Sequence, residues 1–398
     1  MGTHLSCGAG TAYHRLRQLR HTLHMHPELS GDERETAGVI AAYLKALGLP
    51  TETGIGGHGV VAVLATGRPG PTIAYRADMD ALPLQETSDH AYTSMMLGVS
   101  HACGHDVHMT IALGVAEQLI ENVDELQGRV MFVFQPAEES LDGARSMLED
   151  GLFERATPDA MLALHAFPLP VGHVGVARGP CLAGMEEFRV RFYTPAGDRE
   201  ALIDEAIRRL EALSTEQAPT DVDTLAPVIR RMRAGAPSLS RAVFISGWPA
   251  TPGSVSQTHI LGLVSLPDEA SRAPMRDSIE ATLGECTASF GASFDLDVTF
   301  SSPPLHNDRA LVERIVPAMQ QALELGAVQV YDAPYPFAHE DFARYAEKVP
   351  AALLWLGTQN LEKGIPSVLH TPDYDVDEAS LEIGVRAMAA AISDLLRS

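Results

Sequence analysis

The strands predicted along this chain change character near residue 186, and this change constrains the fold more than any other feature. Before it, the segments 59–66, 72–80 and 129–135 are apolar on both faces, as strands buried inside a parallel sheet are. In 186–194, which reads EEFRVRFYT, polar and apolar residues alternate strictly. Such alternation is typical of a half-buried antiparallel strand. We therefore expect two different sheets in the chain.

Helical periodicity separates the strands of the first kind, for example in 13–28 and 34–49, and another helix is expected to begin near Asp106. Alternating strands and helices predict an α/β layer architecture. After Pro304 the same pattern returns, with a strand over 351–358 and a final helix. The first and last parts of the chain should therefore form one domain.

The interruption reads strand, helix, two strands, helix and strand, which is the split βαβ order of a ferredoxin-like domain. We predict an α/β domain with a central mixed sheet flanked by helices, formed by 1–185 and 303–398. A smaller ferredoxin-like α+β domain, 186–302, interrupts it. A length of 398 residues suits two domains.

The charge and the cysteines limit the partners and the compartment. A net charge of -23 argues against nucleic acid and against an anionic membrane surface, because both require a basic face. The four cysteines, Cys7, Cys103, Cys181 and Cys286, follow no disulfide spacing typical of secreted proteins. The first residues show no apolar leader. We expect a cytoplasmic protein with no nucleic-acid partner and no membrane association.

Polar groups gather where the predicted strands of the first kind end. They are Asp78 and Asp80, the segment HACGHDVH from His101 to His108, the adjacent Glu138 and Glu139, His165, and His370. In parallel sheets, ligands bind at the carboxyl ends of strands. Adjacent carboxylates repel each other unless a cation or a proton lies between them. Histidine and cysteine are ligands for divalent transition metals, so together these groups favour a metal site.

Each group taken alone has an ordinary structural interpretation. A single histidine such as His165 is more often a structural hydrogen-bonding residue, and Glu138 and Glu139 are compatible with a solvated surface. Asp78 and Asp80 are compatible with capping of the next helix. The metal site is favoured only because all five groups occur at strand ends of one predicted domain.

Seven segments carry a resemblance to a known family. They are HMHPELSGDE, YRADMDALPLQE, HACGHDVHM, VFQPAEES, ALHAFP, HEDFARY and LHTPDYDVDEASLEIG. In this order they resemble the M20 metallopeptidase family, and specifically its amidohydrolase branch of aminoacylase-like, hippurate-hydrolase-like and auxin-conjugate-hydrolase-like enzymes. The resemblance covers about 21–180 and 335–385, which is most of the larger predicted domain.

The resemblance implies an enzyme with two divalent metal ions, of zinc, manganese, cobalt or nickel. Its implied metal ligands are Cys103, His105, Glu139, His165 and His370. Glu138 matches the general base, and Asp80 matches the aspartate that orients a ligand. A water activated by the metals would cleave the amide bond of a small N-acyl amino acid or related amide. His101 and His108 keep a structural interpretation, and Asp106 is expected at a helix start or behind the ligands.

The smaller domain is implied to be a lid and dimerisation domain, so a homodimer is expected, and FRVRFYT is a candidate edge strand for the pairing. Relatives carry a histidine after its first strand, but FYTPAGDREAL has none. Relatives also carry an Asn-Val-Ile-Pro stretch and a following arginine, which TPGSVSQTHILGLVSLPD lacks. The candidate replacements are Arg189, Arg191, Arg241 and His339, and His339 is also our predicted substrate-binding residue.

Three hypotheses follow from this departure. The first is a metal-dependent amidohydrolase acting on a small-molecule amide. The second keeps the metals and changes the substrate or the reaction. The third is a metal-binding pseudoenzyme, which the presence of Glu138 argues against because such a protein has no need of a base.

Overall fold

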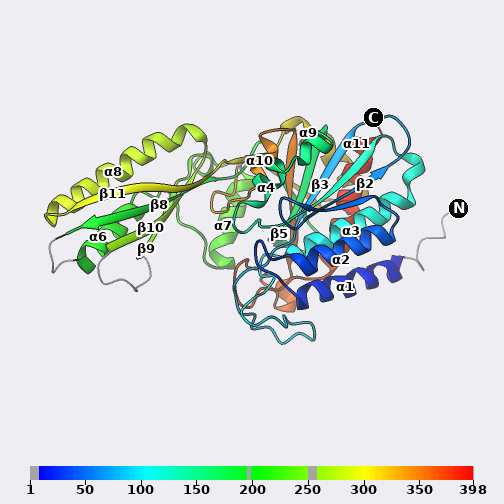
Figure 1. Cartoon of the computed structure of the whole chain (residues 1–398). Coiled ribbons are helices and arrows are strands. Elements are labelled where there is room, and N and C mark those ends of the chain that lie inside the picture. The colour runs from blue at the N-terminus through cyan, green and yellow to red at the C-terminus, as the bar shows by residue number, and fades with distance from the viewer. Residues whose placement is uncertain (1–8, 195–198, 250–257, 398) are drawn as a thin grey trace. The chain divides into compact units, whose positions relative to one another are not determined.

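A computed structural model describes residues 9–194, 199–249 and 258–397 of the chain (Figure 1). They form two compact units. The larger unit comprises Met1–Arg178, Asn307–Val330 and Arg344–Ser398, and the smaller comprises Gly179–His306 and Tyr331–Ala343. The smaller unit therefore extends beyond 186–302 at both ends and also includes a separate later segment.

The larger unit contains an eight-stranded sheet in the order β1-β2-β4-β3-β5-β14-β6-β13. Its strands are β1 (Thr51–Ile55), β2 (Gly59–Ala65), β3 (Thr72–Asp78), β4 (Arg129–Gln135), β5 (Ala160–Pro170), β6 (Val174–Ala177), β13 (Val328–Tyr331) and β14 (Ala351–Gln359). β3, β4, β5 and β14 run parallel, whereas β2 and β6 run antiparallel to their neighbours. This confirms the predicted mixed sheet.

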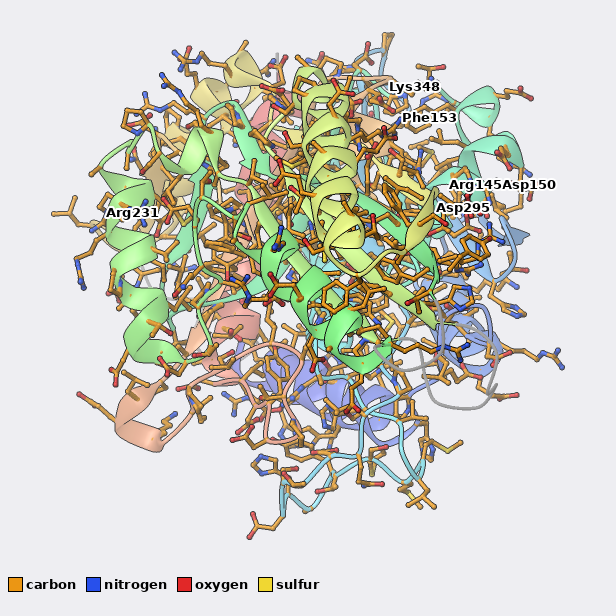
Figure 2. The ribbon with its side chains drawn as sticks, turned by 90° about the vertical axis from the view of Figure 1, so that its left-hand side faces the viewer. Arg145, Asp150, Phe153, Arg231, Asp295 and Lys348 are labelled. Atoms are coloured by element: carbon orange, nitrogen blue, oxygen red, sulfur yellow. The ribbon has the colours of Figure 1, made fainter. Side chains whose placement is uncertain are left out.

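Helices flank this sheet (Figure 1). They are α1 (Ala9–Met25), α2 (Arg34–Ala46), α3 (His105–Glu121), α4 (Gly143–Glu149), α5 (Leu152–Arg155), α9 (Arg309–Ala322), α10 (Ala343–Ala346) and α11 (Ala379–Leu396). Among the described residues, no helix has the length and apolar character needed to cross a membrane. Exposed helices carry charged pairs, such as Arg145 of α4 with Asp142 and Glu149; Figure 2 labels Arg145.

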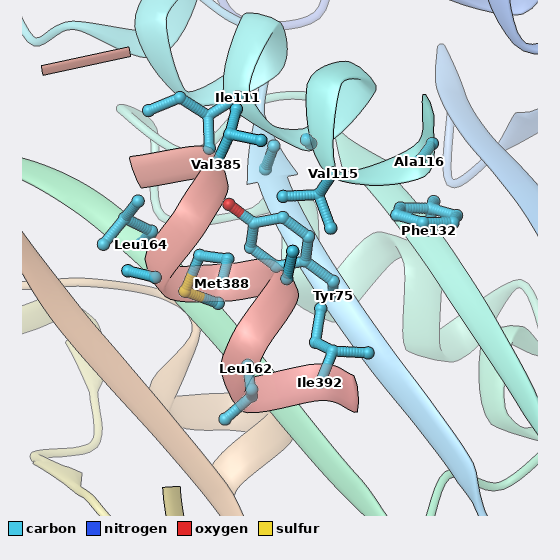
Figure 3. Packing of buried hydrophobic residues seen from close by; sticks show 14 of the residues in the cluster. Tyr75, Ile111, Val115, Ala116, Phe132, Leu162, Leu164, Val385, Met388 and Ile392 are labelled. Carbon is cyan, nitrogen blue, oxygen red and sulfur yellow. The ribbon is translucent and has the colours of Figure 1, made fainter. Parts of the chain in front are cut away.

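α3 and α11 lie against the middle of the sheet (Figure 3). Ile111 and Val115 of α3, Val385 and Met388 of α11, and Tyr75 of β3 are all buried in one apolar cluster. Burying each aliphatic side chain of this kind contributes roughly 1.5–3 kcal/mol. The packing therefore fixes α3 against the sheet, and this in turn fixes the residues at its first turn.

The smaller unit contains a four-stranded antiparallel sheet in the order β11-β8-β10-β9. Its strands are β8 (Gly184–Tyr193), β9 (Phe244–Pro249), β10 (Thr258–Leu266) and β11 (Ser293–Ser302), and its helices are α6 (Arg199–Glu211), α7 (Val222–Arg233) and α8 (Arg272–Ser289). Phe188 and Val190 of β8 pack with Leu210 of α6 and Leu283 of α8. This is the predicted ferredoxin-like arrangement, with α7 added. Two short strands, β7 (Pro180–Leu182) and β12 (Leu305–His306), pair beside it.

The expectation that FRVRFYT forms an edge strand was wrong. The segment belongs to β8, where Val190 pairs with Leu296 of β11 on one side and with Ile260 of β10 on the other. The edges of this sheet are β11 and β9. Alternation in a sequence shows that one face of a strand is buried, but it does not show whether both of its sides are hydrogen-bonded.

Candidate metal centre

The predicted ligands converge at one edge of the large sheet because β3, β4, β5 and β14 are parallel. Asp80 follows β3, Glu138 and Glu139 follow β4, His165 lies within β5, and His370 follows β14. The carboxyl ends of parallel strands meet at the same sheet edge, which brings together residues far apart in the chain.

The other two ligands, Cys103 and His105, lie on either side of a close backbone approach at the start of α3. Gly104 precedes the helix with a φ of 87°, in the left-handed region that glycine adopts freely. A Cβ atom there would lie 2.6 Å from the Tyr374 hydroxyl and 2.9 Å from the Ala166 Cβ. Only glycine fits, and it places Cys103 and His105 on either side of this turn.

The first ligand group is Cys103, Glu139 and His370. Nε2 of His370 lies 3.2 Å from Sγ of Cys103 and 3.5 Å from Oε1 of Glu139. Nε2 of His165 lies 3.5 Å from the same sulfur, and its Nδ1 donates to the Ala166 carbonyl. Burial and the neighbouring carboxylates raise the pKa of the Cys103 thiol, so the thiolate that binds a metal would need the cation to stabilise it.

The second group is His105, Glu138 and Glu139. Nδ1 of His105 donates to the Asp80 carbonyl at 2.8 Å, so Nε2 faces the glutamates. It lies 3.7 Å from Oε1 of Glu139 and 3.9 Å from Oε2 of Glu138. Glu139 thus belongs to both groups, and Glu138 lies beside it in the second.

Several buried atoms at this site have no hydrogen-bond partner among the described residues. They include Oδ1 of Asp80, Nε2 of His105 and Oε1 of Glu139. Buried polar atoms without a partner are costly, and a divalent cation would satisfy them. Although burial alone would lower it, Asp78, Asp80 and Glu139 raise the pKa of His105 to about 10. The site therefore attracts positive charge, and the mixed N, O and S donors suit a divalent transition metal.

A third cluster at this edge is already saturated by hydrogen bonds. Asp78 accepts from Nδ1 of His108 at 2.6 Å and from Nη1 of Arg76 at 2.6 Å. Nε2 of His108 accepts from the Ala166 amide at 2.7 Å. His108 is therefore hydrogen-bonded to β5 next to His165, which agrees with the structural interpretation of His108.

The network behind the site includes three residues to which the sequence assigned no role, Ser30, Arg20 and His24. Ser30 donates to Oδ2 of Asp80 at 2.6 Å, and the Glu139 amide donates to the same oxygen at 2.9 Å. Asp106 is fully buried and accepts from Nε of Arg20 and Nδ1 of His24, both at 2.9 Å. Ser30 and His24 lie in HMHPELSGDE, which carries the family resemblance, but only the fold shows what its polar groups contact.

His339 and the missing segments belong to the smaller unit. Nε2 of His339 lies 2.8 Å from the Ser265 hydroxyl, and burial lowers its pKa to about 4. The His339 ring is therefore neutral, and it is hydrogen-bonded to Ser265 of β10. Arg191 of β8 pairs with Asp297 at the exposed surface. The segments that lack the family histidine and asparagine fall partly in 195–198 and 250–257, outside the described residues.

Residues 74–394 match the sequence profile of Peptidase family M20/M25/M40. The chain belongs to this family. Among its M20 relatives, an N-acetylcysteine deacetylase of Bacillus subtilis is 31% identical over 392 residues, covering 96% of this chain and 97% of the relative. An IAA-amino acid hydrolase ILR1-like protein of Arabidopsis thaliana is 31% identical over 383 residues, covering 94% and 79%.

The crystal structure of the Bacillus subtilis YXEP protein, described as a dinuclear metal-binding peptidase from the M20 family, is also similar. It superposes with a TM-score of 0.76 at 27% identity, covering 97% of this chain and 99% of that one. The predicted family is thereby confirmed, and the M20 relatives of this chain are hydrolases. The individual roles of the site residues stay predictions.

Proposed function

We propose that this M20 protein hydrolyses the amide bond of a small N-acyl amino acid or related amide. The observation that carries the proposal is the adjacent pair Glu138 and Glu139, because both carboxylates face Nε2 of His105 and Glu139 also faces His370. In this proposal Glu139 holds metal and Glu138 transfers the proton. The deacetylase and hydrolase names of the relatives support the reaction class.

Cys103, His105, Glu139, His165 and His370 would hold two divalent ions. When bound, such ions lower the pKa of a water molecule and polarise the carbonyl of the amide. Glu138 accepts a proton from the water as its oxygen attacks the carbonyl carbon, and then delivers this proton to the leaving amine nitrogen as the C–N bond breaks. Asp80 holds His105 through its carbonyl and Glu139 through its carboxylate.

The test compares Glu138→Gln with Glu139→Gln in protein reconstituted with Zn²⁺, Mn²⁺, Co²⁺ or Ni²⁺. Released amine is measured by mass spectrometry over a panel of N-acetyl and N-benzoyl amino acids, and bound metal is measured by elemental analysis. We expect Glu138→Gln to lower turnover by about 10²–10⁴-fold with metal content unchanged. Glu139→Gln should lose metal as well as turnover.

Glu149→Gln is the matched control, since this glutamate of α4 is exposed and pairs only with Arg145 among the described residues. It should keep full activity and full metal content. Turnover that survives in Glu138→Gln would refute the assignment of the base.

A second candidate keeps the metal centre and changes the substrate or reaction. It is favoured by the absence of the relatives' histidine from FYTPAGDREAL, because losing one oxyanion donor costs roughly 10²–10³ in rate. Efficient turnover of ordinary N-acyl amino acids would exclude the second candidate.

In either case we propose a homodimer, for which β11 and β9 offer strand edges. Light scattering of the purified protein would test the dimer.

A further inference from the structure

The turn that follows β4 has an unusual backbone. Ala137 has a φ of 56°, in the left-handed region that alanine rarely adopts. Its carbonyl accepts from the Gly143 amide at 3.0 Å, which closes the turn around Glu138 and Glu139. A Cβ atom at Gly143 would lie 1.7 Å from the Pro136 carbonyl oxygen, so the turn is tightly wound. A strained backbone of this kind persists only where its surroundings hold it in place.

A carboxylate that is distant in the sequence binds the backbone of this turn. Glu33, just before α2, is fully buried, and its Oε1 accepts from the Ala137 amide at 2.8 Å. The same oxygen accepts from the Gly31 amide at 2.8 Å, which fixes the direction of the carboxylate. Hydrogen bonds from amides to a carboxylate are charge-assisted and strong.

The neighbouring amide on the other side of Glu138 is held separately. The Glu139 amide donates to Oδ2 of Asp80, which also accepts from Ser30. The backbone of Glu138 is therefore fixed by carboxylates at the residue before it and the residue after it. Glu33 itself and Ser30, which donates to Asp80, both lie in one short segment, Ser30 to Glu33.

We propose that Glu33 is a positioning residue for the general base. By holding the Ala137 amide, it keeps the left-handed turn and so the direction in which the Glu138 side chain leaves it. This inference rests on the proposed function of Glu138. The effect of Glu33 on the backbone of the turn can be measured separately, without a substrate.

The test uses the full-length, metal-loaded protein and the variants Glu33→Gln and Glu33→Ala. Glutamine keeps an oxygen that accepts both amides, whereas alanine removes it. We expect Glu33→Ala to lower kcat by about 10–10²-fold at an unchanged KM, because small misplacements of a catalytic group have effects of this size. Glu33→Gln should stay within about threefold of the parent protein. In a Glu138→Gln background, Glu33→Ala should cause no further loss.

A second readout follows amide hydrogen exchange in the peptide covering 136–143. Glu33→Ala should speed exchange there, and Glu33→Gln should leave it unchanged. If Glu138→Gln were to retain turnover, the proposed function would fail, and this exchange measurement would still decide whether Glu33 holds the turn. Should Glu33→Ala not fold, Glu33→Asp takes its place, because its shorter side chain cannot reach both amides.

The matched control is Glu117→Ala. Glu117 accepts from the Tyr43 hydroxyl at 2.7 Å and so links α2 to α3 away from the turn. It should leave kcat and the exchange of 136–143 unchanged. The proposal is overturned if Glu33→Gln is as impaired as Glu33→Ala, if the losses add in the Glu138→Gln background, or if exchange in the turn does not respond.

Discussion

At the scale of single residues, the buried charge of Asp106 behind the metal centre is compensated by two side chains from α1. Asp106 follows His105 directly, and its carboxylate is completely buried. Arg20 and His24 approach it from α1, and Arg20 also reaches Glu378 at 3.1 Å. Removing one partner of such a group leaves an uncompensated charge in the interior. The free-energy cost of that charge exceeds the net stabilisation that the intact pair provides.

Replacing Arg20 with methionine should therefore lower the free energy of unfolding by about 3–5 kcal/mol. Urea denaturation followed by circular dichroism measures this loss. Arg145→Met is the control, because Arg145 pairs with Asp142 and Glu149 at the exposed surface, where ion pairs contribute little. Its denaturation midpoint should match that of the parent protein. Equal midpoints for the two variants would contradict the role given to Arg20.

At the scale of elements, a glycine in the sheet of the smaller unit leaves room for an aromatic ring from the neighbouring strand. Gly262 of β10 lies opposite Phe188 of β8, and a Cβ atom at Gly262 would lie 2.2 Å from the Phe188 ring. The ring therefore occupies the space that a side chain would need. An apolar strand pattern cannot show this, because it does not record which neighbour fills a position.

Gly262→Ala should lower the free energy of unfolding by about 1–3 kcal/mol, since it overpacks this contact. Gly284→Ala is its counterpart in α8 of the same unit, where nothing lies within 4 Å of the added Cβ. It should raise the free energy of unfolding by up to about 1 kcal/mol, because alanine favours the helix. Thermal unfolding of both variants gives the comparison, and a loss of stability in Gly284→Ala would contradict the prediction.

At the scale of the whole molecule, His24 links three segments that are distant in sequence. Its Nδ1 lies 2.9 Å from Asp106 and its Nε2 lies 3.3 Å from Glu86. Burial opposes the charged ring, but the two carboxylates raise the pKa of His24 to about 9. Since the folded pKa exceeds the unfolded value of about 6.5, the stabilisation is fully present below 6.5 and is lost as pH rises through 9.

We therefore expect the parent protein to lose about 3 kcal/mol from this group between about pH 6 and pH 10. His24→Gln should lack that part of the pH dependence. The measurement is the difference in unfolding free energy between the two proteins across this range. A difference that stays constant with pH would show that His24 does not titrate as its contacts indicate.

Much of this protein was predictable from its sequence. The change in strand pattern near residue 186 distinguishes two sheets, because the period of apolar residues depends on which faces are buried. The polar groups at strand ends follow from the same reasoning, and the seven motifs identify the M20 family, which residues 74–394 match. These features are local, so a linear pattern can carry them.

The tertiary structure alone decided what those groups contact. β8 proved to be an interior strand, His108 is bound to Asp78, and His339 is bound to Ser265. Glu33 and Ala137 are 104 positions apart, and no periodicity relates them. Strand order and long-range hydrogen bonds depend on how elements pack together in space, and a local pattern holds no record of that packing.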